Sequence, residues 1–251
     1  MYSILPISLS SSPTKWLISL IIALAFSTLT QAQSNNDIEG ASSQQIWIDL
    51  SPHFKLGEQT KYIGDFGFRK IVDDDSWARI FLRPAVRHQL NEILSIQADI
   101  GVSYDWSKNN IDYLIVTPRQ GIKLDWPSFV RFSFSHLIRI EERFSYQTSD
   151  WSHTLNLRIR YKLDGTFDFK LRKTGNFWFL PFYAEVFLGG DDDTHKFLKN
   201  RVRSGVGLGY DPANTWQYIF LANWQNSISS DEYQQISDII YQLKIKKTIG
   251  N

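Results

Sequence analysis

The sequence predicts an all-β protein: a transmembrane up-and-down antiparallel β-barrel of about twelve strands, with ten as the alternative count. Three observations predict it. Strands alternate between an apolar face and an arginine-rich face, an export signal precedes them, and Trp and Tyr residues gather near strand ends. A sheet with lipid on one side and a wet, charged interior on the other has this inverted polarity.

The alternation is clearest in residues 129–163, two arms that the polar turn QTSDWS joins into a predicted hairpin. The apolar face of the second arm consists of Leu155, Leu157, Ile159, Tyr161 and Leu163. The polar face of that arm consists of Thr154, Asn156, Arg158, Arg160 and Lys162. A repeat of two residues is typical of a β-strand whose two faces differ.

Eleven segments carry this pattern. They are residues 46–56, 62–70, 77–87, 94–105, 112–125, 129–146, 153–163, 177–188, 201–210, 216–225 and 237–247. Residues 165–176 fit either a twelfth strand or a long loop. We favour twelve strands because single-chain bacterial barrels have even numbers. Pro118 predicts a bulge in its strand, since proline donates no hydrogen bond to the ladder.

The first segment predicts export. Lys15 is the only charge in the first 32 residues, the apolar run of residues 16–29 follows it, and Ala32 ends a small-residue cleavage site. The apolar run is shorter than the roughly 20 residues that a membrane-spanning helix needs, which weighs against an anchor. We therefore expect a signal peptide at 1–32, an N-terminal lead at 33–45 and the barrel at 46–251.

The Trp and Tyr residues near strand ends favour a membrane setting, because such residues form girdles at lipid–water interfaces. The girdle residues we expect are Trp77, Tyr104, Trp126, Tyr146, Tyr161, Trp178, Tyr210, Trp216 and Trp224. The alternative is a soluble lipocalin-like barrel or sandwich with its apolar face inside. Periodicity alone does not distinguish inside from outside.

Composition excludes several functions. The net charge of +1 does not fit a nucleic-acid binder, and the absence of Cys excludes disulfides and thiolate chemistry. We expect no enzyme, cofactor or metal site. The nearest catalytic grouping is Ser133, Ser135 and His136, and His136 is out of phase with the arginines. His195 beside three Asp residues fits a solvated turn better than a metal site.

The polar face suggests the function. Basic residues outnumber acidic ones on this face, because many acidic residues fall in turns. The predicted lumen and solute-binding residues are Arg79, Arg83, Arg139, Glu141, Arg143, Arg158, Arg160, Glu185, Arg201 and Arg203. Two interpretations stay open: pairing with carboxylates that holds the barrel shut, or an arginine-lined lumen that selects anions.

Four segments, SHLIRIEERF, LNLRIRYKL, PFYAEVF and RVRSGVGLGY, resemble the domain-of-unknown-function 2490 family in order and spacing. The resemblance covers about residues 47–247. The matching positions are Arg139, Glu141, Arg143, Arg158, Arg160, Glu185, Arg201 and residues 207–210. The resemblance implies an exported outer-membrane β-barrel of a Gram-negative bacterium and implies no particular activity.

We therefore expect a porin-like barrel in the bacterial outer membrane that passes or holds small anionic solutes. A closed barrel that maintains the envelope is the first alternative, and an outer-membrane enzyme acting on lipid is the second. The expected partners are outer-membrane lipid, small anionic solutes and, during biogenesis, the barrel-assembly machinery. No nucleic acid is expected.

Overall fold

The computed structural model describes residues 42–72, 77–108, 111–170, 175–190, 201–228 and 235–250. All of them belong to the compact unit of residues 40–251. The predicted signal peptide and most of the predicted lead lie outside the described residues. No helix in the described ranges is long and apolar enough to cross a membrane.

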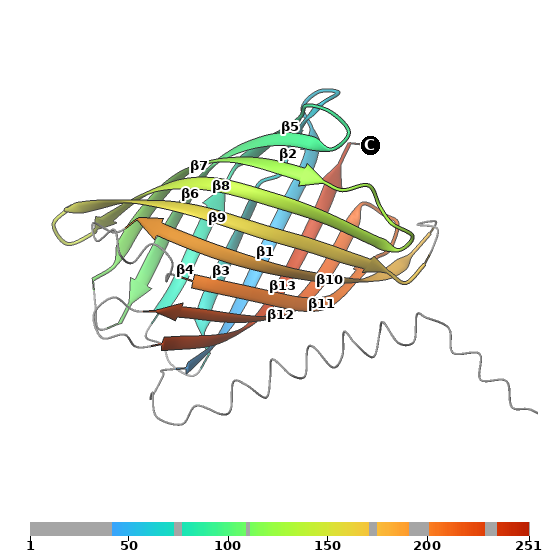
Figure 1. Ribbon diagram of the computed structural model, residues 1–251. Coiled ribbons are helices and arrows are strands. Elements are labelled where there is room, and N and C mark those ends of the chain that lie inside the picture. The colour runs from blue at the N-terminus through green and yellow to red at the C-terminus, as the bar shows by residue number, and fades with distance from the viewer. Residues whose placement is uncertain are drawn as a thin grey trace, which may run out of the picture. The chain divides into compact units, whose positions relative to one another are not determined.

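The described chain is built from thirteen β-strands (Figure 1). They are β1 (Ser42–Lys55), β2 (Thr60–Tyr62), β3 (Asp65–Ile71), β4 (Trp77–Arg83), β5 (Ala85–Gln89), β6 (Leu94–Ser107), β7 (Tyr113–Asp125), β8 (Phe132–Gln147), β9 (His153–Asp168), β10 (Phe177–Gly190), β11 (Arg201–Asp211), β12 (Trp216–Ile228) and β13 (Gln235–Ile249). The β8–β9 hairpin joins the two longest strands, and the turn between them is the one that the sequence predicts.

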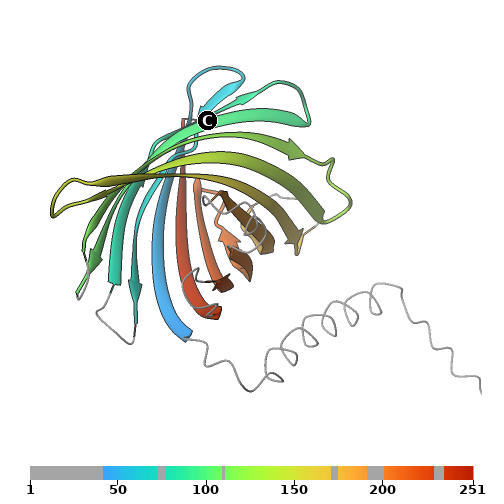
Figure 2. The same cartoon turned by 60° about the vertical axis from the view of Figure 1, so that its left-hand side comes forward.

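The strands close into a barrel. From β13 back to β6, strands that are consecutive in the sequence pair antiparallel, and β4, β3 and β1 continue the wall. The barrel closes where β1 lies parallel to β13, from Ser42 opposite Ser237 to Phe54 opposite Ile249 (Figure 2). The predicted all-β barrel is confirmed.

The strand count differs from the predicted twelve, because eleven strands form the closed wall. Strands β2 and β5 are short extensions of β3 and β4 beyond breaks at Ile63–Gly64 and at Pro84. An odd count forces the first and last strands of an alternating series to run in the same direction. The parallel closure of β1 on β13 is the consequence.

Residues 165–176 do not supply a twelfth strand. Gly165 to Asp168 form the end of β9, where Asp168 lies opposite Phe179 of β10. The described residues that follow, 169–170 and 175–176, lie outside strands, and residues 171–174 are outside the described ranges. The long β9 therefore accounts for the alternating pattern that made this segment ambiguous.

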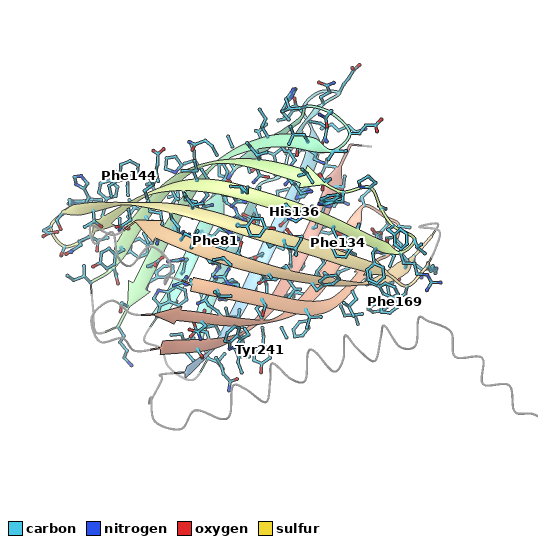
Figure 3. All side chains as sticks on the ribbon, in the orientation of Figure 1. Phe81, Phe134, His136, Phe144, Phe169 and Tyr241 are labelled. Atoms are coloured by element: carbon cyan, nitrogen blue, oxygen red, sulfur yellow. The ribbon has the colours of Figure 1, made fainter. Side chains whose placement is uncertain are left out.

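The barrel has a polar inner face and an apolar outer face, as the sequence predicts. Buried side chains include Asp49, Asp99, Glu141 and Glu185, whereas Ile138 is 53 % exposed. Other exposed outward residues are Ile80, Leu82, Ile100, Ile122, Leu155, Leu157, Val206, Leu208 and Phe220. Three of the residues labelled in Figure 3, namely Phe134, His136 and Tyr241, lie on the outer face. A lipocalin-like barrel with an apolar interior is excluded.

Aromatic residues gather on the outer face toward both rims. Trp126, Trp178 and Trp216 are exposed near the rim where β13 ends, and Trp106 and Trp224 lie toward the opposite rim. Trp77 is an exception, and the prediction for it was wrong. It shares the inner face of β4 with Arg79, whose Cζ lies 5.3 Å from the centre of its ring.

The predicted bulge at Pro118 is also absent. Strand β7 pairs with β6 without a break, from Leu94 opposite Leu124 to Asp105 opposite Tyr113. Thr117 and Arg119 stay on the inner face on either side of the proline. Only the ladder between β7 and β8 is interrupted at this point, because proline has no N–H to donate.

Glycines in β11 allow its backbone to lie close to the neighbouring strand of the barrel wall. A Cβ atom at Gly207 would overlap the backbone carbonyl oxygen of Phe220 in β12. We expect Gly207→Ala to destabilise the barrel by about 1–3 kcal/mol, because backbone in a closed sheet cannot move aside easily. Denaturant unfolding of the refolded protein measures this. Ser204→Ala, on the outer face of the same strand, is the control, and equal stability of both variants would contradict the prediction.

Candidate functional site

A polar cavity of about 380 Å³ lies inside the barrel. Among the described residues, eleven basic side chains line it: Arg69, Arg79, Arg83, Arg119, Arg143, Arg158, Arg160, Lys162, Arg201, Arg203 and Lys244. Four acidic side chains line it: Asp49, Asp65, Asp164 and Glu185. The cavity lining is therefore strongly cationic.

Glu141 of β8 is the carboxylate on which the inner network centres, and its side chain is fully buried. It forms an ion pair with Arg158, which lies directly opposite on β9. Its Oε1 also lies 3.6 Å from Arg160, 3.7 Å from Arg119 and 3.9 Å from Arg139. One carboxylate thus lies within 3.9 Å of four arginines on three adjacent strands.

Glu185 of β10 holds a second group together. It pairs with Arg160 of β9, and its Oε2 lies 3.5 Å from Arg203 of β11. Because Arg160 contacts both Glu141 and Glu185, the two groups form one network. Each arginine in this network retains N–H groups beyond those that the two carboxylates accept.

Two further ion pairs lie on the neighbouring strands β3, β4 and β6. Arg79 forms a two-pronged pair with Asp105 across β4 and β6, and Arg83 does the same with Asp65 across β3 and β4. Parallel N–H···O bonds of this kind fix the guanidinium plane as well as its position. These arginines are therefore held by the wall.

Aromatic rings support the arginines. Phe187 of β10 is 3 % exposed, and the guanidinium carbons of four arginines lie within 6.0 Å of its centroid. These four are Arg158, Arg160, Arg201 and Arg203. Arg69 lies between two other rings, 3.9 Å from Trp47 and 4.6 Å from Phe81. The negative face of an aromatic ring stabilises such cations.

Arg143 and Arg201 differ from the paired arginines of the cavity. Neither forms an ion pair with a carboxylate of the described residues, although both line the cavity. Arg69 shares this property, but the rings of Trp47 and Phe81 hold its guanidinium group. Arg201 lies within electrostatic range of four other arginines, namely Arg79, Arg143, Arg158 and Arg203. Their guanidinium groups therefore leave cationic hydrogen-bond donors directed into a polar cavity.

The structure places all ten predicted lumen residues on the inner face. Eight line the cavity, and Arg139 and Glu141 are buried beside it. The prediction omitted Arg69, Arg119, Lys162 and Lys244 from the site, and it omitted the supporting rings of Trp47 and Phe187. The alternation in the sequence could have placed both rings on the inner face, because Phe187 is in phase with Glu185 and Trp47 is in phase with Asp49.

The one catalytic grouping in the sequence is not assembled. Ser135 faces inward and is buried, whereas His136 faces outward, where its Nδ1 lies 2.7 Å from the hydroxyl of Tyr161 (Figure 3). A nucleophile and its base must be within hydrogen-bond reach. No group of three or more His, Cys, Asp or Glu side chains in the described ranges is arranged to hold a metal ion, and His195 lies outside those ranges.

The sequence profile of the DUF2490 family, described as proteins of unknown function, matches residues 44–234. The chain belongs to this family. The match spans β1 to the end of β12 and contains all ten predicted lumen residues of this DUF2490 protein. No curated protein matches the chain. The family supplies no activity, so the chemistry of the interior has to carry the functional argument.

Proposed function

We propose that this DUF2490 protein is an outer-membrane β-barrel of a Gram-negative bacterium whose lumen binds or passes small anionic solutes. The observation that carries the proposal is the cavity lining, with eleven basic and four acidic side chains. Arginine stays charged at every physiological pH and binds carboxylates and phosphates with two parallel N–H groups. A lumen lined with it favours anions over cations.

The outer face supports the membrane part of the proposal. Isoleucine, leucine and phenylalanine side chains are exposed around the wall, and tryptophans gather toward both rims. Most strands of the closed wall have 11–16 residues, and a tilted strand needs about 9–11 to cross a membrane. Export of such a barrel would use the signal peptide, and its insertion would use the barrel-assembly machinery.

The test is conductance of the refolded mature protein in a planar bilayer, together with calorimetric titration of phosphate and succinate. We expect binding of at least one anion or an anion-selective current. Both effects should weaken in Arg143→Gln/Arg201→Gln, because these two arginines have no carboxylate partner among the described residues. Lys170→Gln/Lys247→Gln removes the same charge away from the cavity and should retain both.

A closed barrel with a structural role in the envelope is the second candidate. The observation that favours it is the ion pairing of Arg79, Arg83, Arg158 and Arg160, which resembles a lumen filled by its own side chains. A folded barrel that neither binds an anion nor conducts would overturn our proposal and leave this one. We assign no catalysis to the protein.

A further inference from the structure

A second cationic region lies at the rim where β1 and β13 end, and we call it the lysine mouth. It consists of Lys55, Lys61, Arg87, Lys123, Lys244 and Lys246. All six share the inner-face phase of their strands. None of them belongs to the predicted lumen residues. Arg201, by contrast, is the first residue of β11 and lies toward the opposite rim.

Like charges face each other across neighbouring strands in the lysine mouth. Lys55 of β1 lies directly opposite Lys61 of β2, and Lys61 lies directly opposite Arg87 of β5. Like charges in directly opposed positions destabilise a sheet. Arg87 donates to the amide oxygen of Gln97, at 2.8 and 3.2 Å, rather than to a carboxylate. None of the three cations in this row forms an ion pair with a carboxylate of the described residues, although Asp164 lies within electrostatic range of Arg87.

The other members converge on the same row. Lys246 lies within electrostatic range of Lys61, Lys244 and Arg87, and Lys123 lies within range of Lys61 and Arg87. Acidic groups are fewer here. Asp125 pairs with Lys123, Asp164 lies within electrostatic range of Arg87 and Lys123, and Asp211 lies within range of Lys246. Among the described residues, Lys55, Lys61, Lys244 and Lys246 form no ion pair with a carboxylate.

The two cationic regions share Lys244 and extend from it toward opposite rims of the barrel. Lys244 lines the cavity, faces Asp49 across β13 and β1, and lies within electrostatic range of Arg83. Arg201 lies opposite Ser227 of β12, which pairs with Ile236 of β13, ten residues before Lys246. An anion held at the lysine mouth would therefore occupy a position of its own. Arg143 and Arg201 would not contact it.

We propose that the lysine mouth is a second anion site, and that it takes phosphate groups. An ammonium group is a compact charge with three donors, and several of them around one point satisfy a tetrahedral phosphate from different sides. The phosphate belongs either to a free solute entering the lumen or to a lipid headgroup at the rim. The inference rests on the proposed function for its membrane setting.

The test is titration of inorganic pyrophosphate into the refolded mature barrel in nanodiscs of zwitterionic lipid. We expect two sites for the parent protein. Lys61→Gln/Lys246→Gln should lose one, with affinity there at least about tenfold weaker, and should keep the other. Arg143→Gln/Arg201→Gln should show the reverse. Lys170→Gln/Lys247→Gln is the charge-matched control and should keep both.

A second arm distinguishes the two sources of phosphate. If the lysine mouth binds lipid headgroups, it should already be occupied in nanodiscs that contain anionic phospholipid, and pyrophosphate should fill only one site. Anionic phospholipid should then raise the melting temperature of the parent but not that of Lys61→Gln/Lys246→Gln. If the lysine mouth binds free solutes, the parent should still bind two pyrophosphates in these nanodiscs. A parent with one site that Arg143→Gln/Arg201→Gln abolishes would overturn the lysine mouth and leave the proposed function standing. If neither double variant loses pyrophosphate binding, both the lysine mouth and the proposed function would be overturned.

Discussion

Glu141→Gln is expected to be among the most destabilising single substitutions in the barrel, at about 3–5 kcal/mol. The fully buried carboxylate of Glu141 pairs with Arg158 and lies within 3.9 Å of Arg119, Arg139 and Arg160. Its neutralisation leaves these arginines to repel one another with only Glu185 and Asp99 nearby. Urea unfolding in lipid vesicles, followed by tryptophan fluorescence, measures the loss.

Glu142→Gln is the matched control, because it changes the adjacent carboxylate on the opposite face of β8. Glu142 forms no ion pair among the described residues, and we expect the variant to unfold close to the parent. If Glu141→Gln loses no more stability than Glu142→Gln, the ion-pair network around Glu141 does not hold β7, β8 and β9 together. The role assigned to the inner carboxylates would then be wrong.

Arginine at a mid-strand position of the outer face has the second large expected effect. Ile100 of β6 is 52 % exposed, and Ile159 lies on the outer face of β9. If the outer face contacts lipid, Ile100→Arg and Ile159→Arg should each disfavour the inserted state by about 2–4 kcal/mol. Unfolding of each variant from lipid vesicles gives the measurement.

The control for depth is Ile249→Arg. Ile249 is the last residue of β13, it is also exposed, and it lies at the rim. The cost of a lipid-facing cation falls to about 0–1 kcal/mol near an interface, so this variant should insert almost as well as the parent. Equal costs at all three positions, or none at any of them, would contradict a bilayer around this barrel.

The sequence was sufficient for the polarity of the wall. Because strand side chains alternate with a period of two, the arginines at 139, 143, 158 and 160 fix which residues share a face with them. The same local rule failed at Trp77, whose position near a strand start suggested a girdle although its phase with Arg79 places it inside. At that position, phase was the stronger signal.

The sequence alone did not determine which arginine pairs with which carboxylate. Glu141 and Glu185 were both predicted as inner carboxylates, but the arginines with which they form ion pairs depend on the register of β7 to β11. Register is a property of strand pairs. That Arg143 and Arg201 are left without a described carboxylate partner, whereas Arg158 and Arg160 are paired, follows from those registers.

The sequence by itself therefore determined a β-barrel with an apolar outside and an arginine-rich inside, since both follow from residue-by-residue alternation. Only the tertiary structure decided that the wall has eleven strands, that β9 runs to Asp168, and that the lysines of β1, β2 and β13 meet at one rim. The physical reason is that closure pairs β1 with β13, about two hundred residues apart in the chain, and no local pattern encodes the direction of that contact.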